Sequence, residues 1–149
     1  MKNPLSTLKS LVQILNDGHE GFKKAAEDIK DTELKTLFSK FSLQRKKFAG
    51  ELETELRSLG EKDPQNEGTT YAGTAHRVWI DLKAAVLGND SHAVLAEAER
   101  GEDVAVQAYK DAIADENLTA SLRSIITRQA AEVKATHDEV KKLRDAVAR

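Results

Sequence analysis

The chain has 149 residues, of which 40% are hydrophobic and 32% charged, and 23 Lys and Arg against 25 Asp and Glu give a net charge of −2. This length suits one domain that buries its own core, so we expect residues 1–149 to form a single domain rich in helix. The near-balanced charge gives no basic footprint for a nucleic-acid partner, and the lack of cysteine excludes disulfides and thiolate chemistry.

Residues 3–29 have the periodicity of a helix that packs along its whole length. Apolar side chains recur at alternating steps of four and three residues from Leu5 to Ile29. His19 is the polar member of this stripe. The sequence therefore predicts a long first helix with one imidazole on its packing face.

A second long helix is predicted between a capping residue, Asp31 or Thr32, and Gly60. Aspartate and threonine cap helix starts, and glycine adopts the left-handed conformation that ends them. Its inner stripe is apolar except at Gln44. Because the connection to the first helix is short, the two helices should form an antiparallel hairpin.

The middle of the chain predicts a loop and a shorter helix. Residues 61–69 combine turn formers with charges and have no apolar period. A helix over about 71–87 follows, with Tyr71 and Trp79 as its aromatic residues, and 88–90 (Gly-Asn-Asp) ends it. The two aromatic side chains could anchor a partner, or could pack this segment onto the long helices.

The last part of the chain predicts a second hairpin of long helices. One helix runs to about residue 114 with Glu102 on a stripe of mostly small residues. The final helix follows residue 117 and carries Gln129 and Thr136 on its apolar stripe.

Counting outward from the two short turns predicts a polar layer inside the protein. The count places His19 near Gln44 and Glu102 near Gln129, at about mid-height. Three glycines, at 18, 21 and 101, flank this level inside helices, where each costs roughly 1 kcal/mol relative to alanine. We therefore expect something to approach the backbone closely there.

Four stretches of the sequence resemble a known family. They are residues 17–28, 44–52, 76–83 and 97–103. Together they resemble the bacterial family called domain of unknown function 2383, which is more distantly similar to the ferritin and rubrerythrin superfamily. The resemblance implies an all-α, ferritin-like four-helix bundle, in which a crossover containing a short helix joins two antiparallel hairpins. It implies no activity, although the wider superfamily points to stress-related roles.

The residues do not supply the dinuclear metal site that the superfamily implies. That site takes one Glu from each of two helices and a Glu-x-x-His pair from each of the other two. The residues three positions before the four histidines are Asn16, Gly73, Asn89 and Lys134, so the pair does not occur. Cations also follow Gln44, where one pair would lie.

Two functional interpretations remain open from the sequence. In the first, the chain is a non-enzymatic binding or assembly protein without a cofactor. Its polar layer is a hydrogen-bonded network of His19, Gln44, Glu102 and Gln129. In the second, it binds Fe, Mn or Zn and performs oxidative or peroxide chemistry. The metal ligands would be His19, Glu20, Glu102 and Asp103.

Partners and location follow from what the sequence lacks. Neither a signal-peptide core nor an apolar run near ~18 residues is present, so we expect a cytoplasmic protein that does not bind membranes. Self-association, for example as a homodimer, is expected by analogy with ferritin-like proteins. His137, next to Asp138, could be a metal ligand or a boundary histidine of the last helix.

Overall fold

The computed structural model describes residues 4–61 and 72–147, and these residues form five α-helices and no strand. The helices are α1 (Pro4–Asp28), α2 (Thr32–Ser58), α3 (Ala72–Leu87), α4 (Ser91–Ile113) and α5 (Ala120–Ala146). The all-α prediction is confirmed. The residue expected to cap α1 (Asn3), the predicted 61–69 loop after residue 61, and Tyr71 lie outside the described residues.

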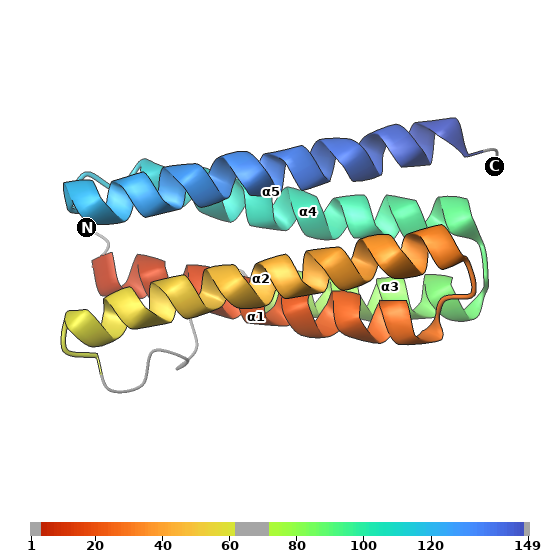
Figure 1. Cartoon of the computed structure of the whole chain (residues 1–149), viewed down its shortest axis with the longest axis horizontal. Helices are drawn as coiled ribbons and strands as arrows, with labels where there is room; N and C mark the ends of the chain where they lie inside the picture. Colours follow the sequence, from red (N-terminus) through yellow and green to blue (C-terminus); the bar gives the residue numbers. More distant parts are fainter. Residues whose placement is uncertain (1–3, 62–71, 148–149) are drawn as a thin grey trace.

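The four long helices lie along one axis as two hairpins (Figure 1). α1 packs antiparallel to α2, and α4 packs antiparallel to α5. The shorter α3 runs in the same direction as α1 and packs on both α1 and α4. It therefore returns the chain from the end of the first hairpin to the start of the second.

The helix ends follow the capping chemistry that the sequence predicts. The Asp31 carboxylate accepts from the backbone N–H of Leu34 at 3.1 Å and caps α2. Gly60 has φ of 92° just after α2, in the left-handed region. Asp90 caps α4 in the same way as Asp31, and Thr119 caps α5.

The core is divided into two apolar clusters. One contains the first half of α1, the second half of α2, and the α4–α5 turn. The other holds three rings at the opposite end, from Phe22, Phe38 and Phe41, with Phe22 and Phe41 packed edge to face at 5.4 Å. Between these clusters α1, α2, α4 and α5 contribute polar side chains, as the sequence predicts for mid-height.

Side chains of α3 occupy the space beside two of the three glycines, at 21 and 101. A Cβ atom on Gly21 would lie 2.8 Å from Cζ3 of Trp79 and closer still to other ring atoms. A Cβ atom on Gly101 would lie 3.2 Å from Cγ1 of Val78. Trp79 also contacts the Phe22 ring edge to face at 5.1 Å. The predicted close approach is therefore that of α3, and Trp79 packs α3 onto the long helices.

Candidate functional site

An ion pair lies at the centre of the polar layer. Nη2 of Arg45 donates to Oε2 of Glu102 at 2.6 Å and to the hydroxyl of Thr136 at 2.9 Å. The Arg45 side chain is 2% exposed and that of Glu102 is 0% exposed. Such a desolvated pair is strongly coupled, because each charge is costly to bury without the other.

The Phe22 ring and the Thr136 hydroxyl hold the two charged side chains in place. The Arg45 guanidinium lies over the Phe22 ring, with 5.7 Å between its Cζ atom and the ring centroid. The Thr136 hydroxyl lies 2.6 Å from Oε2 of Glu102 and 2.7 Å from the carbonyl oxygen of Val133. The other Glu102 oxygen, Oε1, is buried and has no hydrogen-bond partner.

His19 contacts the neighbouring helix instead of the ion pair. The Ser42 hydroxyl donates to the backbone oxygen of His19 at 2.9 Å. Nδ1 of His19 lies 2.8 Å from Oγ of Ser42 and 3.1 Å from its carbonyl oxygen. Donation from Nδ1 to Ser42 leaves Nε2 as the acceptor nitrogen, 3.7 Å from Oε1 of Glu20.

The predicted pairing of His19 with Gln44 is wrong, because Gln44 is not the residue that α2 contributes to the centre of the layer. His19 lies opposite Ser42, and Gln44 is two residues further on, which is about 200° around the helix. The Gln44 side chain is half-buried and accepts from Nε of Arg45 at 3.1 Å. Arg45 takes the central position because Glu102 neutralises its charge.

Gln129 is fully buried as predicted, but it belongs to a separate polar layer. Its Oε1 accepts from the Tyr109 hydroxyl at 2.7 Å, and its Nε2 donates to the Phe48 carbonyl oxygen at 3.3 Å and to Oε1 of Glu51 at 3.1 Å. Burial raises the pKa of Tyr109 far above its usual range, so the phenol remains a donor.

The predicted pairing of Glu102 with Gln129 is wrong by two helical turns. Glu102 lies opposite Thr136, seven residues beyond Gln129. The predicted pairing assumes that the chain turns back directly after α4. In the structure α5 starts beyond the last turn of α4, because residues 114–119 carry the chain outward before turning back (Figure 1).

The four predicted metal ligands are not gathered at one point. His19 contacts Ser42, and the Glu20 side chain is 61% exposed on α1. Glu102 is paired with Arg45, and Oδ1 of Asp103 lies 2.6 Å from Nε2 of His137. Asp103 is thus the one member of the set that lies in a group of metal-ligating residues.

That group, Glu99, Asp103 and His137, lies where α4 meets α5. One ligand atom from each residue lies within 4.8 Å of the other two, and the described part of the chain holds no other such group of three or more. Nδ1 of His137 is 3.1 Å from Oδ1 of Asp138. Burial disfavours the imidazolium, but hydrogen bonds to Asp138 and Asp103 outweigh burial and raise the pKa of His137.

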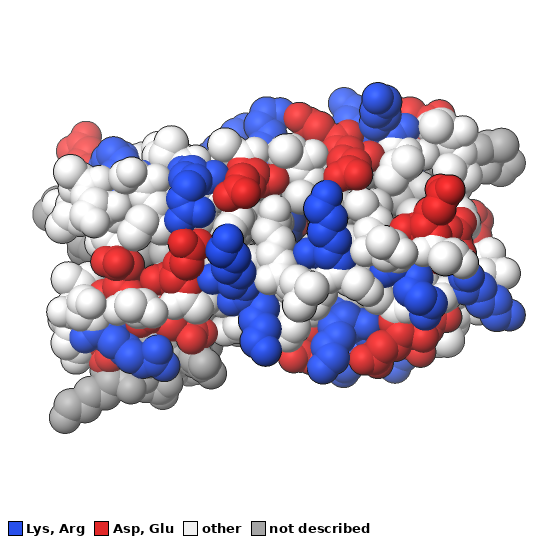
Figure 2. All heavy atoms as spheres, viewed as in Figure 1, with Lys and Arg blue, Asp and Glu red and all other residues white. Residues whose placement is uncertain are grey.

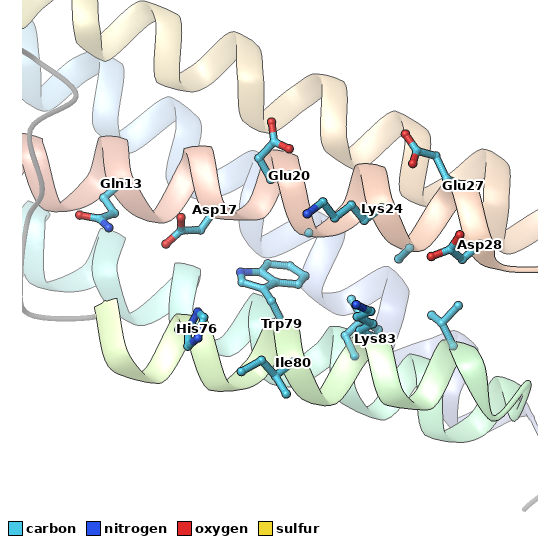
Figure 3. A pocket seen from close by; sticks show the side chains of 14 residues that line it. Gln13, Asp17, Glu20, Lys24, Glu27, Asp28, His76, Trp79, Ile80 and Lys83 are labelled. Atoms are coloured by element: carbon cyan, nitrogen blue, oxygen red, sulfur yellow. The ribbon is translucent and has the colours of Figure 1, made fainter.

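A groove of about 1000 Å³ runs along α1 and α3, and residues of both helices line it (Figure 3). The α1 wall carries Asp17, Glu20 and Lys24, and the α3 wall carries His76 and Lys83. Trp79 points from α3 toward α1 across the floor. Burial raises the pKa of Asp17, and the nearby His76 partly opposes this shift.

The surface carries both signs of charge. Lys and Arg are interspersed with Asp and Glu on the face drawn in Figure 2. Within the described residues, no helix is long and apolar enough to cross a membrane. Among the described residues, Leu43 on α2 and Leu87 on α3 are the most exposed large apolar side chains.

The comparisons with known proteins identify a family. The family model described as Domain of unknown function (DUF2383) matches residues 3–115 of the 149. The match spans α1 to α4, together with the ion-pair residues Arg45 and Glu102, and ends before α5. A search of the curated proteins found no match.

Proposed function

We propose that the chain, which belongs to the DUF2383 family, is a ferritin-like four-helix bundle that acts by binding and self-association and has no catalytic metal at its centre. The observation that carries this proposal is the buried pair of Arg45 and Glu102, 2.6 Å apart. It lies between the two apolar clusters, at the height where ferritin-like bundles hold metal ions.

The central residues do not fit a dinuclear metal site. Such a site needs several carboxylates and two imidazoles that are free to bind. Here the guanidinium of Arg45 lies against Glu102, the one fully buried carboxylate among the described residues, so a cation already neutralises it. The imidazole that the sequence predicts for this layer, that of His19, is held by Ser42. The centre therefore does not supply the ligands that a dinuclear metal reaction needs.

The topology supports the ferritin-like part of the proposal. Two antiparallel hairpins are joined by α3, which runs back along them, so that α2 and α4 point the same way (Figure 1). A long crossover between two hairpins is the connection found in ferritin-like bundles. The crossover helix is also the element that builds the groove.

The groove favours a second copy of this chain as the partner. Ile80, which lines the groove, is 54% exposed, and Leu87, two turns further along α3, is 69% exposed. Lys83 lies between them, and the opposite wall carries the carboxylates of Asp17 and Glu20. In a two-fold dimer the same patch appears on both copies, so that the α3 cation of one copy can meet α1 carboxylates of the other.

Light scattering coupled to size exclusion would test the self-association. We expect the parent chain to run as a dimer, and Ile80→Lys to run as a monomer, because Ile80 lines the groove and the new cation would be desolvated beside Lys83 in the interface. Leu43→Lys is the matched control, because Leu43 is 67% exposed and lies on α2, which contributes no residue to the lining of the groove. A monomeric parent, or equal effects of the two substitutions, would contradict the proposal.

A further inference from the structure

We propose that Glu99, Asp103 and His137 form a mononuclear site for a divalent transition metal of the zinc class, which links α4 to α5. The three side chains lie outside the central layer, on the two helices of the second hairpin. One imidazole and two carboxylates are ligand types that zinc accepts. The site is separate from the groove and does not depend on self-association.

The spacing of the ligand atoms suits one small cation. The atoms lie within 4.8 Å of one another, and ligands of a tetrahedral zinc ion are about 3.4 Å apart at metal–ligand distances near 2.1 Å. Nε2 of His137 and Oδ1 of Asp103 are now 2.6 Å apart and share a proton. A metal ion would replace this proton after a small rotation of Asp103, whose side chain is 59% exposed.

Glu99 has one carboxylate oxygen that is available to a metal ion. Its Oε1 accepts from Nη1 of Arg144 at 2.6 Å, while its Oε2 is buried and has no hydrogen-bond partner. Buried carboxylate oxygens are normally paired, so Oε2 of Glu99 has room for a partner, which a metal ion can provide. Arg144 would keep Oε1 in place while Oε2 binds the metal.

Asp138 prepares the imidazole for this role. Its Oδ1 lies 3.1 Å from Nδ1 of His137. When the proton is on Nδ1, Nε2 carries the lone pair that a metal needs, and a carboxylate behind a ligating histidine raises its basicity. Lys134 donates to the same carboxylate at 3.2 Å and fixes its position.

Zinc titration of the untagged, metal-free protein by calorimetry would test the site. We expect one zinc ion per chain and a higher thermal midpoint with zinc than with a chelator. Asp103→Asn should weaken binding at least tenfold, and it should not endanger folding because the side chain is exposed. His137→Ala should abolish binding, and Asp138→Asn should weaken it about tenfold.

The variant His19→Ala distinguishes this peripheral site from a metal site at the centre that uses His19. Its zinc affinity should equal that of the parent, because His19 lies on α1 and contacts Ser42. Absence of stoichiometric zinc in the parent, or full zinc binding by Asp103→Asn, would overturn the peripheral site. Zinc binding that is lost in His19→Ala would instead overturn the claim that the centre is free of metal.

Discussion

Replacing Arg45 with Met tests the ion pair directly. Met retains most of the side-chain length and its contact with apolar neighbours, but it removes the charge. Glu102, whose side chain is 0% exposed, would keep only the Thr136 hydroxyl as a donor, because Oε1 already lacks one. The variant therefore isolates the cost of leaving one buried carboxylate without its cation.

The expected cost is large. Breaking a buried ion pair from one side typically costs about 3–5 kcal/mol. For a chain of this size, each kcal/mol lowers the thermal midpoint by about 2–4 °C, so we expect a fall of roughly 6–20 °C. The double variant Arg45→Met with Glu102→Leu should recover most of this loss. In it the Thr136 hydroxyl can still donate to the Val133 carbonyl oxygen, at 2.7 Å in the parent.

Urea unfolding at pH 7 would measure both variants. Circular dichroism at 222 nm reports the helices, and fluorescence reports Trp79, the single tryptophan of the chain. Coincident transitions would justify a two-state free energy of unfolding. A loss below about 1 kcal/mol in Arg45→Met, or a double variant as unstable as the sum of the singles, would refute the proposed coupling.

Two further predictions concern the groove. Gly21→Ala should cost about 1–3 kcal/mol because Trp79 occupies the space, whereas Gly50→Ala, with nothing within 4 Å, should gain about 0.5–1 kcal/mol; similar urea midpoints would contradict the assigned contact. Asp17→Asn should be more stable than the parent at pH 7. Because the pKa of Asp17 is higher in the folded than in the unfolded protein, the parent has its full free energy of unfolding at low pH. Part of it is lost as the pH rises through the folded-state pKa and the buried carboxylate becomes charged. The advantage should therefore shrink toward pH 4, and a constant difference would contradict the argument.

Local chemistry was predictable from the sequence to a large extent. Asp31 and Gly60 bound α2 as their capping propensities predict, and the stripe with His19 predicted α1 along its length. Glu102 and Gln129 were predicted to be buried because they interrupt apolar stripes, and both are fully buried. These features depend only on residues within one helix or one turn.

Pairing between helices was less predictable. The spacing of the α2 stripe places Gln44 on the inner face, but Arg45 is the buried residue, and the partner that allows its burial is 57 residues away. The register of α4 against α5 depends on the path of residues 114–119, which a turn count cannot give. His137 was singled out beside Asp138, but its contact with Asp103 required that register.

The register of α4 against α5 fixes both the buried contact of Glu102 with Thr136 and the contact of Asp103 with His137 at the edge. Glu102 and Asp103 are adjacent on α4, as are Thr136 and His137 on α5, so a rotation of about 100° per residue sends one of each inward and the other to the edge. The contact of Tyr109 with Gln129, seven residues from Glu102 and Thr136 respectively, holds the register at a second height. Because two buried contacts hold α4 against α5, the ligand atoms at the edge are positioned before any ion binds, which lowers the cost of binding one.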